Sequence, residues 1–116
     1  MNAAFSPVED IIKDIAAGRL VVITDDAGRE NEGDLVMAAA RATPARVNFM
    51  ARYGRGLICA PLTAERAREL DLFRMERDNT DPYRTDWLIS VDASSGVTTG
   101  ISASDRARTL RVLADP

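Results

Sequence analysis

The sequence predicts a layered domain of the α/β type, formed as one unit by residues 1–116. Segments with helical and with strand character alternate along the chain, as they do where helices pack against a sheet. A length of 116 residues fits one domain, which can bury roughly two thirds of its unfolded surface. The content of 46% hydrophobic and 28% charged residues is that of an ordinary globular protein. Composition leaves open whether the sheet is parallel or mixed.

Charge and composition argue against nucleic-acid and membrane partners. The net charge is −3, so no basic stripe can follow a phosphate backbone, and aromatic residues for base stacking make up only 5% of the chain. No apolar run is long enough to span a bilayer, and the N-terminus lacks a signal-peptide pattern, so we expect a cytoplasmic protein. The single cysteine, Cys59, excludes an internal disulfide and a multi-cysteine metal site.

The first three elements are expected within residues 6–39. Ser6 is a candidate N-cap before a proline, and apolar residues recur at helical spacing until Gly18, which would end the helix. Residues 20–24 are β-branched and apolar on both faces, which predicts a buried strand. Residues 35–39 predict a second strand. The acidic segment between these strands would therefore be held at both ends by the core.

The middle of the chain predicts two more helices and a short strand. Thr43 is followed by a proline and begins a helix that Gly54 would end. Residues 57–60 predict a third strand. Thr63 is the expected N-cap of a helix that runs to about residue 70.

The last third predicts an irregular segment, a strand and a helix. Residues 71–85 are polar and contain a turn signal. Residues 87–92 alternate in polarity, as a half-buried strand does. Ser102 and Asp105 resemble a capping box that opens a final helix reaching Leu113.

The segment Asp25–Asp34 carries most of the functional information. It places five carboxylates and one guanidinium between two expected strands. Like charges this close repel one another, so the segment suits cation binding or proton transfer. A calcium loop of the EF-hand type does not fit, because arginine or alanine falls at ligand positions and the flanking segments are not helical.

Spacing within this segment groups three of its carboxylates. Glu30, Glu32 and Asp34 lie two residues apart and would project to one side of an extended chain. One or two could hold Mg²⁺ while another remains free as an acid or base. Arg29 is suited to bind an anionic substrate group. The alternative that composition leaves open is a solvated acidic turn.

Three motifs resemble those of a known family and occur along the chain in the same order as in that family. They are Asp25–Leu35, Gly56–Cys59 and the stretch from Ser90 to Arg106, which includes Gly96-Val97-Thr98-Thr99-Gly100. Together they resemble the 3,4-dihydroxy-2-butanone 4-phosphate synthase family over about residues 8–116. The resemblance implies an α+β, three-layer α/β/α sandwich around a mixed sheet, acting as a homodimer. It also implies a lyase of riboflavin biosynthesis that converts D-ribulose 5-phosphate to 3,4-dihydroxy-2-butanone 4-phosphate and formate with Mg²⁺ or Mn²⁺.

The same resemblance assigns roles to individual side chains. It implies acid–base or catalytic roles for Glu32, Asp34 and Cys59, with Asp25 close by. It implies that Glu30 ligates the metal, and that the substrate is contacted by Arg29, Glu30, Asp34, Thr98 and Thr99. From the residues alone, a cysteine in an apolar strand favours core packing, the two threonines could merely end a strand, and Asp105 could serve only as a helix cap.

The resemblance also implies that the domain is truncated at its C-terminus. The family domain continues into an Arg-Pro-Gly-His and a Gly-His-Thr-Glu stretch, which supply a metal-ligating histidine and a later glutamate, whereas this chain has no histidine. The longer protein could be the synthase alone or one fused to a GTP cyclohydrolase II domain. The alternatives are a non-catalytic fragment or paralogue that binds a sugar phosphate or divalent cation, and a generic acidic cation-binding module.

Overall fold

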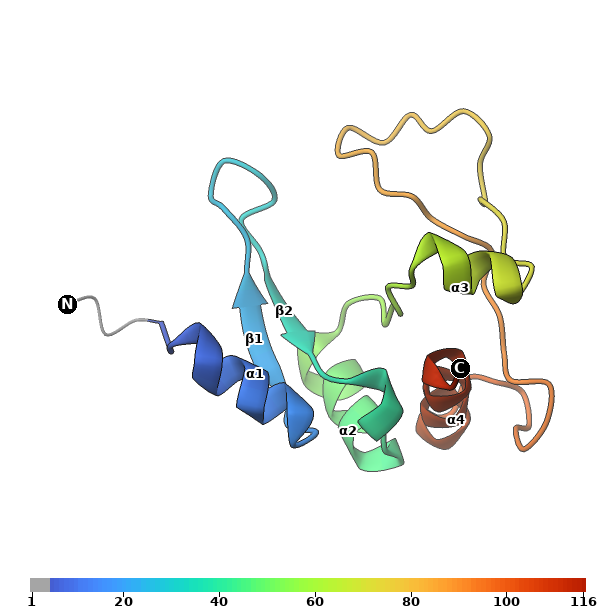
Figure 1. Cartoon of the computed structure of the whole chain (residues 1–116), viewed down its shortest axis with the longest axis horizontal. Helices are drawn as coiled ribbons and strands as arrows, with labels where there is room; N and C mark the ends of the chain where they lie inside the picture. Colours follow the sequence, from blue (N-terminus) through green and yellow to red (C-terminus); the bar gives the residue numbers. More distant parts are fainter. Residues whose placement is uncertain (1–4) are drawn as a thin grey trace.

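The computed structural model describes residues 5–116, which combine helices with a two-stranded antiparallel sheet (Figure 1). This confirms the α+β class, and the three-layer sandwich around a mixed sheet stays a prediction. None of the described helices has the length and apolarity needed to cross a membrane. The elements in chain order are α1 (Val8–Ala16), β1 (Val21–Thr24), β2 (Gly33–Val36), the 3-10 turn η1 (Ala39–Arg41), α2 (Pro44–Phe49), the π-helical turn η2 (Met50–Gly54), α3 (Ala64–Glu69) and α4 (Ala103–Ala114).

The described chain has an open shape. Its radius of gyration is 15.5 Å, with principal extents of 48 × 35 × 26 Å. A compact chain of this length would have a radius of gyration of about 13 Å. Figure 1 shows why: the loop of the β1–β2 hairpin and the long loop after α3 both extend away from the helices. Much apolar surface is left exposed, including Val22, Leu57 and Ile101.

The hairpin fixes the position of the acidic segment. β1 pairs with β2 from Val21 opposite Val36 to Thr24 opposite Gly33. The second strand thus begins two residues earlier than predicted and ends before η1. The strand predicted at residues 20–24 forms at Val21–Thr24. The expectation that it is buried was wrong, because only Val21 is buried. β1 has one strand neighbour in the described sheet and contacts helix α1, and three of its four residues stay exposed.

Two predicted strands do not form. Residues 57–60 are irregular, and residues 87–92 contribute only one isolated bridge, between Arg74 and Leu88. A strand is stabilised by its ladder of hydrogen bonds to a neighbour, and none of the described segments provides such a ladder here. Alternating or apolar sequence was therefore insufficient for strand formation at both places.

Helix caps followed the sequence closely. The hydroxyls of Thr43, Thr63 and Ser102 accept hydrogen bonds from backbone amides three residues later, at 3.3, 3.1 and 3.0 Å. Each of these side chains satisfies an amide that the first helical turn would otherwise leave unpaired. The cap predicted at Ser6 was wrong, since the N-cap of α1 is Pro7 and no side chain caps this helix.

The core lies between α2 and α4. Val47 is fully buried and packs with Ala42 and Ala107, surrounded by partly buried apolar side chains. Arg111 of α4 donates a hydrogen bond of 2.7 Å to the carbonyl oxygen of Ala42. Arg66 of α3 donates to the carbonyl oxygens of residues 112, 113 and 115, so that the exposed carbonyls at the end of α4 are paired.

We expect Val47→Ala to lower the free energy of unfolding by about 2 kcal/mol, because it removes apolar volume from the best-packed site and leaves a cavity. Urea denaturation followed by circular dichroism measures the change. The matched control is Val22→Ala, whose side chain is 64% exposed and which should cost less than about 0.5 kcal/mol. Equal losses in the two variants would contradict the placement of the core.

Candidate functional site

The loop between β1 and β2 is organised by one carboxylate. Asp25 accepts hydrogen bonds from the backbone amides of Glu30 at 2.9 Å and Glu32 at 2.8 Å. Arg29 donates a third hydrogen bond to it through Nη1 at 3.0 Å. These donors, the Glu32 amide foremost, hold the pKa of Asp25 below its ordinary value. Asp25 is therefore ionised and closes the loop on itself.

Arg29 and Glu30 form the outer part of this loop. The Arg29 guanidinium lies 3.0 Å from Asp25 and 3.4 Å from the carboxylate of Glu30, and its own side chain is 52% exposed. The hydrogen bond to Asp25 and the charge of Glu30 raise the pKa of Arg29. The cation remains partly open to solvent, where it can bind an anion.

Three predicted catalytic residues line one cavity. A cavity of about 450 Å³ is bordered by Glu32 and Asp34 from the hairpin and by Cys59 from the segment after η2. Gly54 and Gly56 also border it. Glu32 and Asp34 thus border the same cavity, whereas Glu30, which the spacing grouped with them, does not line it and pairs with Arg29 instead.

Cys59 is exposed and lines this cavity, so the expectation of core packing was wrong. Its thiol donates a weak hydrogen bond of 3.6 Å to the carbonyl oxygen of Leu57. Partial burial, and then the nearby negative charge of Asp34, raise the pKa of Cys59. The side chain is therefore a neutral thiol at pH 7, which suits a proton donor better than a nucleophile.

Thr98 and Thr99 lie away from the acidic loop. Figure 1 places the segment before α4 on the opposite side of the molecule from the hairpin loop. The carboxylate of Asp105 accepts hydrogen bonds from the Thr98 hydroxyl at 2.8 Å and from the amides of Thr98 and Gly100 at 3.0 Å. Asp105 thus fixes the entry to α4, and the described chain does not bring the two threonines to the cavity.

The described residues do not build a complete metal centre. Among residues 5–116, no three His, Cys, Asp or Glu side chains are arranged to hold a metal ion. Glu30 carries the charge and oxygen donors that a hard cation prefers, but its nearest partner is Arg29. The donor set that this part of the chain provides therefore fits one ligand of a site and not the whole.

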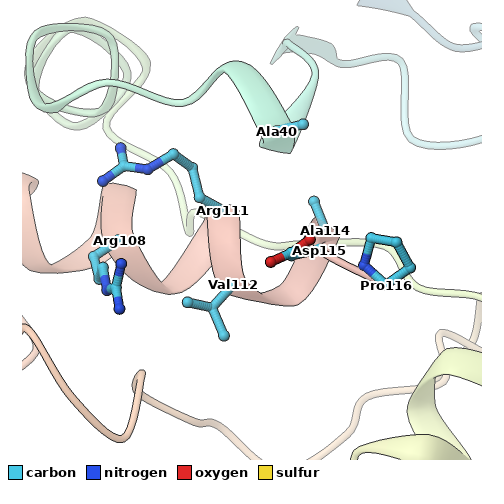
Figure 2. A pocket seen from close by; sticks show the side chains of 7 residues that line it. All are labelled: Ala40, Arg108, Arg111, Val112, Ala114, Asp115 and Pro116. Atoms are coloured by element: carbon cyan, nitrogen blue, oxygen red, sulfur yellow. The ribbon is translucent and has the colours of Figure 1, made fainter.

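A second cavity, of about 370 Å³, lies at the end of α4 (Figure 2). Arg108 and Arg111 border it, but both are bonded to backbone carbonyls, Arg108 to Ser95 at 3.3 Å and Arg111 to Ala42 at 2.7 Å. It contains none of the predicted site residues. We assign these arginines to the packing of α4.

Sequence reasoning missed Tyr83. Its ring lies 5.4 Å from the Arg29 guanidinium, and its hydroxyl donates a hydrogen bond of 3.4 Å to the Arg29 carbonyl oxygen. The two residues are 54 positions apart. No spacing or composition signal in the irregular segment could have paired them.

Comparison with known proteins agrees with the motifs. The family model for 3,4-dihydroxy-2-butanone 4-phosphate synthase matches residues 9–116. A protein of that name from Oceanobacillus iheyensis is 53% identical over 111 residues, which cover 96% of this chain and 53% of the relative. The riboflavin biosynthesis protein RibBA of Aquifex aeolicus is 54% identical over 114 residues, 97% of this chain and 28% of the relative.

The fold is matched as well. A crystal structure of 3,4-dihydroxy-2-butanone 4-phosphate synthase in complex with two magnesium ions has a TM-score of 0.94 and 49% identity, and the match covers 97% of this chain and 52% of that chain. This chain thus spans about half of that protein. The motifs, the family model and the structural match together define the class of protein as a domain of the synthase type found in these relatives. The chain belongs to the 3,4-dihydroxy-2-butanone 4-phosphate synthase family.

We expect Asp25→Ala to loosen the acidic loop, since both backbone amides that it holds lose their acceptor. Hydrogen exchange of the Glu30 and Glu32 amides, measured by NMR, should accelerate about tenfold. Asp26→Ala is the matched control, because the Asp26 carboxylate accepts a hydrogen bond from the Gly28 amide and not from the Glu30 or Glu32 amide, so those two amides should stay protected. Unchanged exchange in the Asp25 variant would show that the loop is held by other contacts.

Asp105 should contribute stability that depends on pH. The Thr98 hydroxyl, followed by the Thr98 and Gly100 amides, holds the pKa of Asp105 below its ordinary value of 3.8. A carboxyl group with a lower pKa in the folded state stabilises the fold above pH 3.8, and the contribution is lost as the pH falls through the lowered pKa. We expect Asp105→Asn to lower the urea midpoint at pH 7 and the difference from wild type to shrink at acidic pH. The control is Asp10→Asn. A difference in urea midpoint between Asp105→Asn and wild type that stays constant with pH, or an equally large difference for the control, would contradict this role.

Proposed function

We propose that this chain supplies the acid–base part of a lyase site that converts D-ribulose 5-phosphate to 3,4-dihydroxy-2-butanone 4-phosphate and formate in riboflavin biosynthesis. The observation that carries the proposal is the cavity shared by Glu32, Asp34 and Cys59. Membership of the synthase family supports the choice of substrate and reaction. The proposal concerns the full-length synthase domain of the relatives, of which the match covers about half.

The reaction requires proton transfers and rearrangement of carbon–carbon bonds. A five-carbon sugar phosphate gives a four-carbon ketone phosphate and formate, whose atoms together equal those of the substrate, so no net oxidation occurs. Enolisation begins when a base removes a proton from the carbon beside the ketone. We assign this chemistry to the carboxylates of Asp34 and Glu32, which border the same space.

Cys59 complements these carboxylates. Its raised pKa keeps the thiol protonated, so it can donate a hydrogen bond or a proton to the developing enediolate oxygen. The negative charge of Asp34 favours this neutral form. The cavity thus offers carboxylate oxygens as proton acceptors and a thiol as proton donor, which are the two kinds of group that acid–base catalysis requires.

Substrate binding is assigned to groups around the cavity and beyond it. Arg29, with its exposed guanidinium, suits the anionic part of the substrate, and Glu30 and Asp34 suit its hydroxyl groups. Thr98 and Thr99 are proposed to bind sugar hydroxyls or phosphate. Because the Thr98 hydroxyl already donates its proton to Asp105, it would accept a hydrogen bond from a sugar hydroxyl, and a donor to phosphate would have to be Thr99.

We further propose that a divalent cation, Mg²⁺ or Mn²⁺, is bound with Glu30 as one ligand. A related crystal structure contains two magnesium ions, which supports a cation in this family. Since the described residues do not form a full donor set, the steps above use protein side chains alone. We also propose a homodimer, as the family resemblance implies, and a cytoplasmic location, as the composition led us to expect.

The decisive test is formate release from ribulose 5-phosphate with Mg²⁺ and with EDTA. The chain itself should be compared with a chimera in which the C-terminal part of the Oceanobacillus iheyensis relative follows residue 116. In the active form, Asp34→Asn should lower kcat about 10²- to 10⁴-fold because it removes a proton acceptor. Asp10→Asn, at an exposed position of α1, should retain wild-type activity.

The outcomes separate the alternatives. Formate from the chimera alone would support a catalytic domain that needs further residues. Metal-dependent formate from the chain itself would contradict our inference that its donor set is incomplete. No formate from either would favour a non-catalytic protein that binds a sugar phosphate or cation.

A further inference from the structure

The loop between residues 73 and 89, called here the 73–89 loop, has a defined structure. Its two ends are joined by backbone hydrogen bonds, Met75 to Trp87 at 2.9 Å and Ile89 to Phe73 at 3.0 Å. Its far end is folded around Asp81, whose carboxylate accepts from the Thr85 amide at 2.8 Å. Figure 1 shows this loop extending on the same side of the molecule as the acidic loop.

Tyr83 connects the 73–89 loop to the acidic loop. Its ring centroid lies 5.4 Å from Cζ of Arg29, within the range of a cation–π interaction. Its hydroxyl adds a hydrogen bond of 3.4 Å to the backbone of the same residue. One aromatic side chain thus contacts both the cation and the main chain of Arg29.

The guanidinium of Arg29 is held from several directions. Asp25 lies 3.0 Å and Glu30 3.4 Å from its terminal nitrogens, while Tyr83 lies over the guanidinium. An arginine side chain normally loses considerable rotamer entropy when it binds a ligand. Contacts that fix it beforehand lower this cost, and the 52% exposure of the Arg29 side chain leaves room for an incoming anion.

We propose that Tyr83 is a positioning residue that holds Arg29 in place for an anionic group of the substrate. The proposal deepens the proposed function and rests on it for the identity of that substrate. Tyr83 acts through Arg29 and is not assigned contact with the reacting atoms. Its role is therefore expected in substrate affinity, with little effect on the chemical step.

The test uses Tyr83→Leu, Tyr83→Phe and the control Tyr53→Leu in the active form of the enzyme. Tyr53 makes a similar contact with Arg52, at 5.5 Å, outside the acidic loop. Tyr83 is 50% exposed, so its variants should fold, which circular dichroism verifies. In NMR spectra of the chain, the ring current of Tyr83 should shift the Arg29 side-chain protons upfield.

We expect Tyr83→Leu to abolish this upfield shift and to raise KM about three- to fivefold, with kcat nearly unchanged. Tyr83→Phe keeps the ring and should resemble wild type in both measurements, as should Tyr53→Leu. An unchanged Arg29 shift or an unchanged KM in Tyr83→Leu would overturn the proposal. If Tyr83→Phe raised KM as much as Tyr83→Leu, the result would contradict a contact made by the aromatic ring.

Failure of the proposed function can be told apart from failure of this inference. If the wild-type protein does not turn over ribulose 5-phosphate, inorganic phosphate replaces it as the probe, and its binding is followed at the Arg29 resonances. A dissociation constant for phosphate raised about three- to fivefold in Tyr83→Leu would support the positioning role without any activity. An equal dissociation constant in both proteins would overturn it.

Discussion

The ionised carboxylate of Asp25 is the constraint on which the acidic loop depends. Five carboxylates in ten residues repel one another, and such a segment would stay extended in water without an internal partner. Asp25 turns one of these charges inward, where two amides and one guanidinium satisfy it. Glu32 and Asp34 can then lie along the hairpin at the edge of the cavity.

The sequence predicted best those features whose interacting groups lie close together along the chain. The caps at Thr63 and Ser102 and the helix start at Thr43 were predicted because a side-chain hydroxyl and an amide three residues later need no distant partner. Strands were predicted less well, since residues 57–60 and 87–92 require a neighbouring ladder that their own sequence does not supply.

In the candidate site, too, residues close in sequence could be grouped beforehand, whereas contacts between distant segments could not. Glu32 and Asp34 could be grouped from their spacing, and the family motifs added Cys59, which its apolar surroundings had suggested was buried. The engagement of Thr98 with Asp105 and the contact of Tyr83 with Arg29 depend on how separate segments meet. A single sequence does not predict such contacts, because two residues that lie 54 positions apart produce no periodic pattern in the sequence.

The register of the β1–β2 hairpin has a consequence for how this domain tolerates change. Ile23 lies opposite Asp34, and successive side chains point to opposite faces of a strand. A slip of one residue would carry Asp34 away from Cys59 to the other face, although every backbone hydrogen bond could be replaced by an equivalent one. Insertions of a single residue in β1 or β2 are therefore far more damaging than insertions of the same length in the 73–89 loop, and natural length variation in this family should concentrate outside the hairpin.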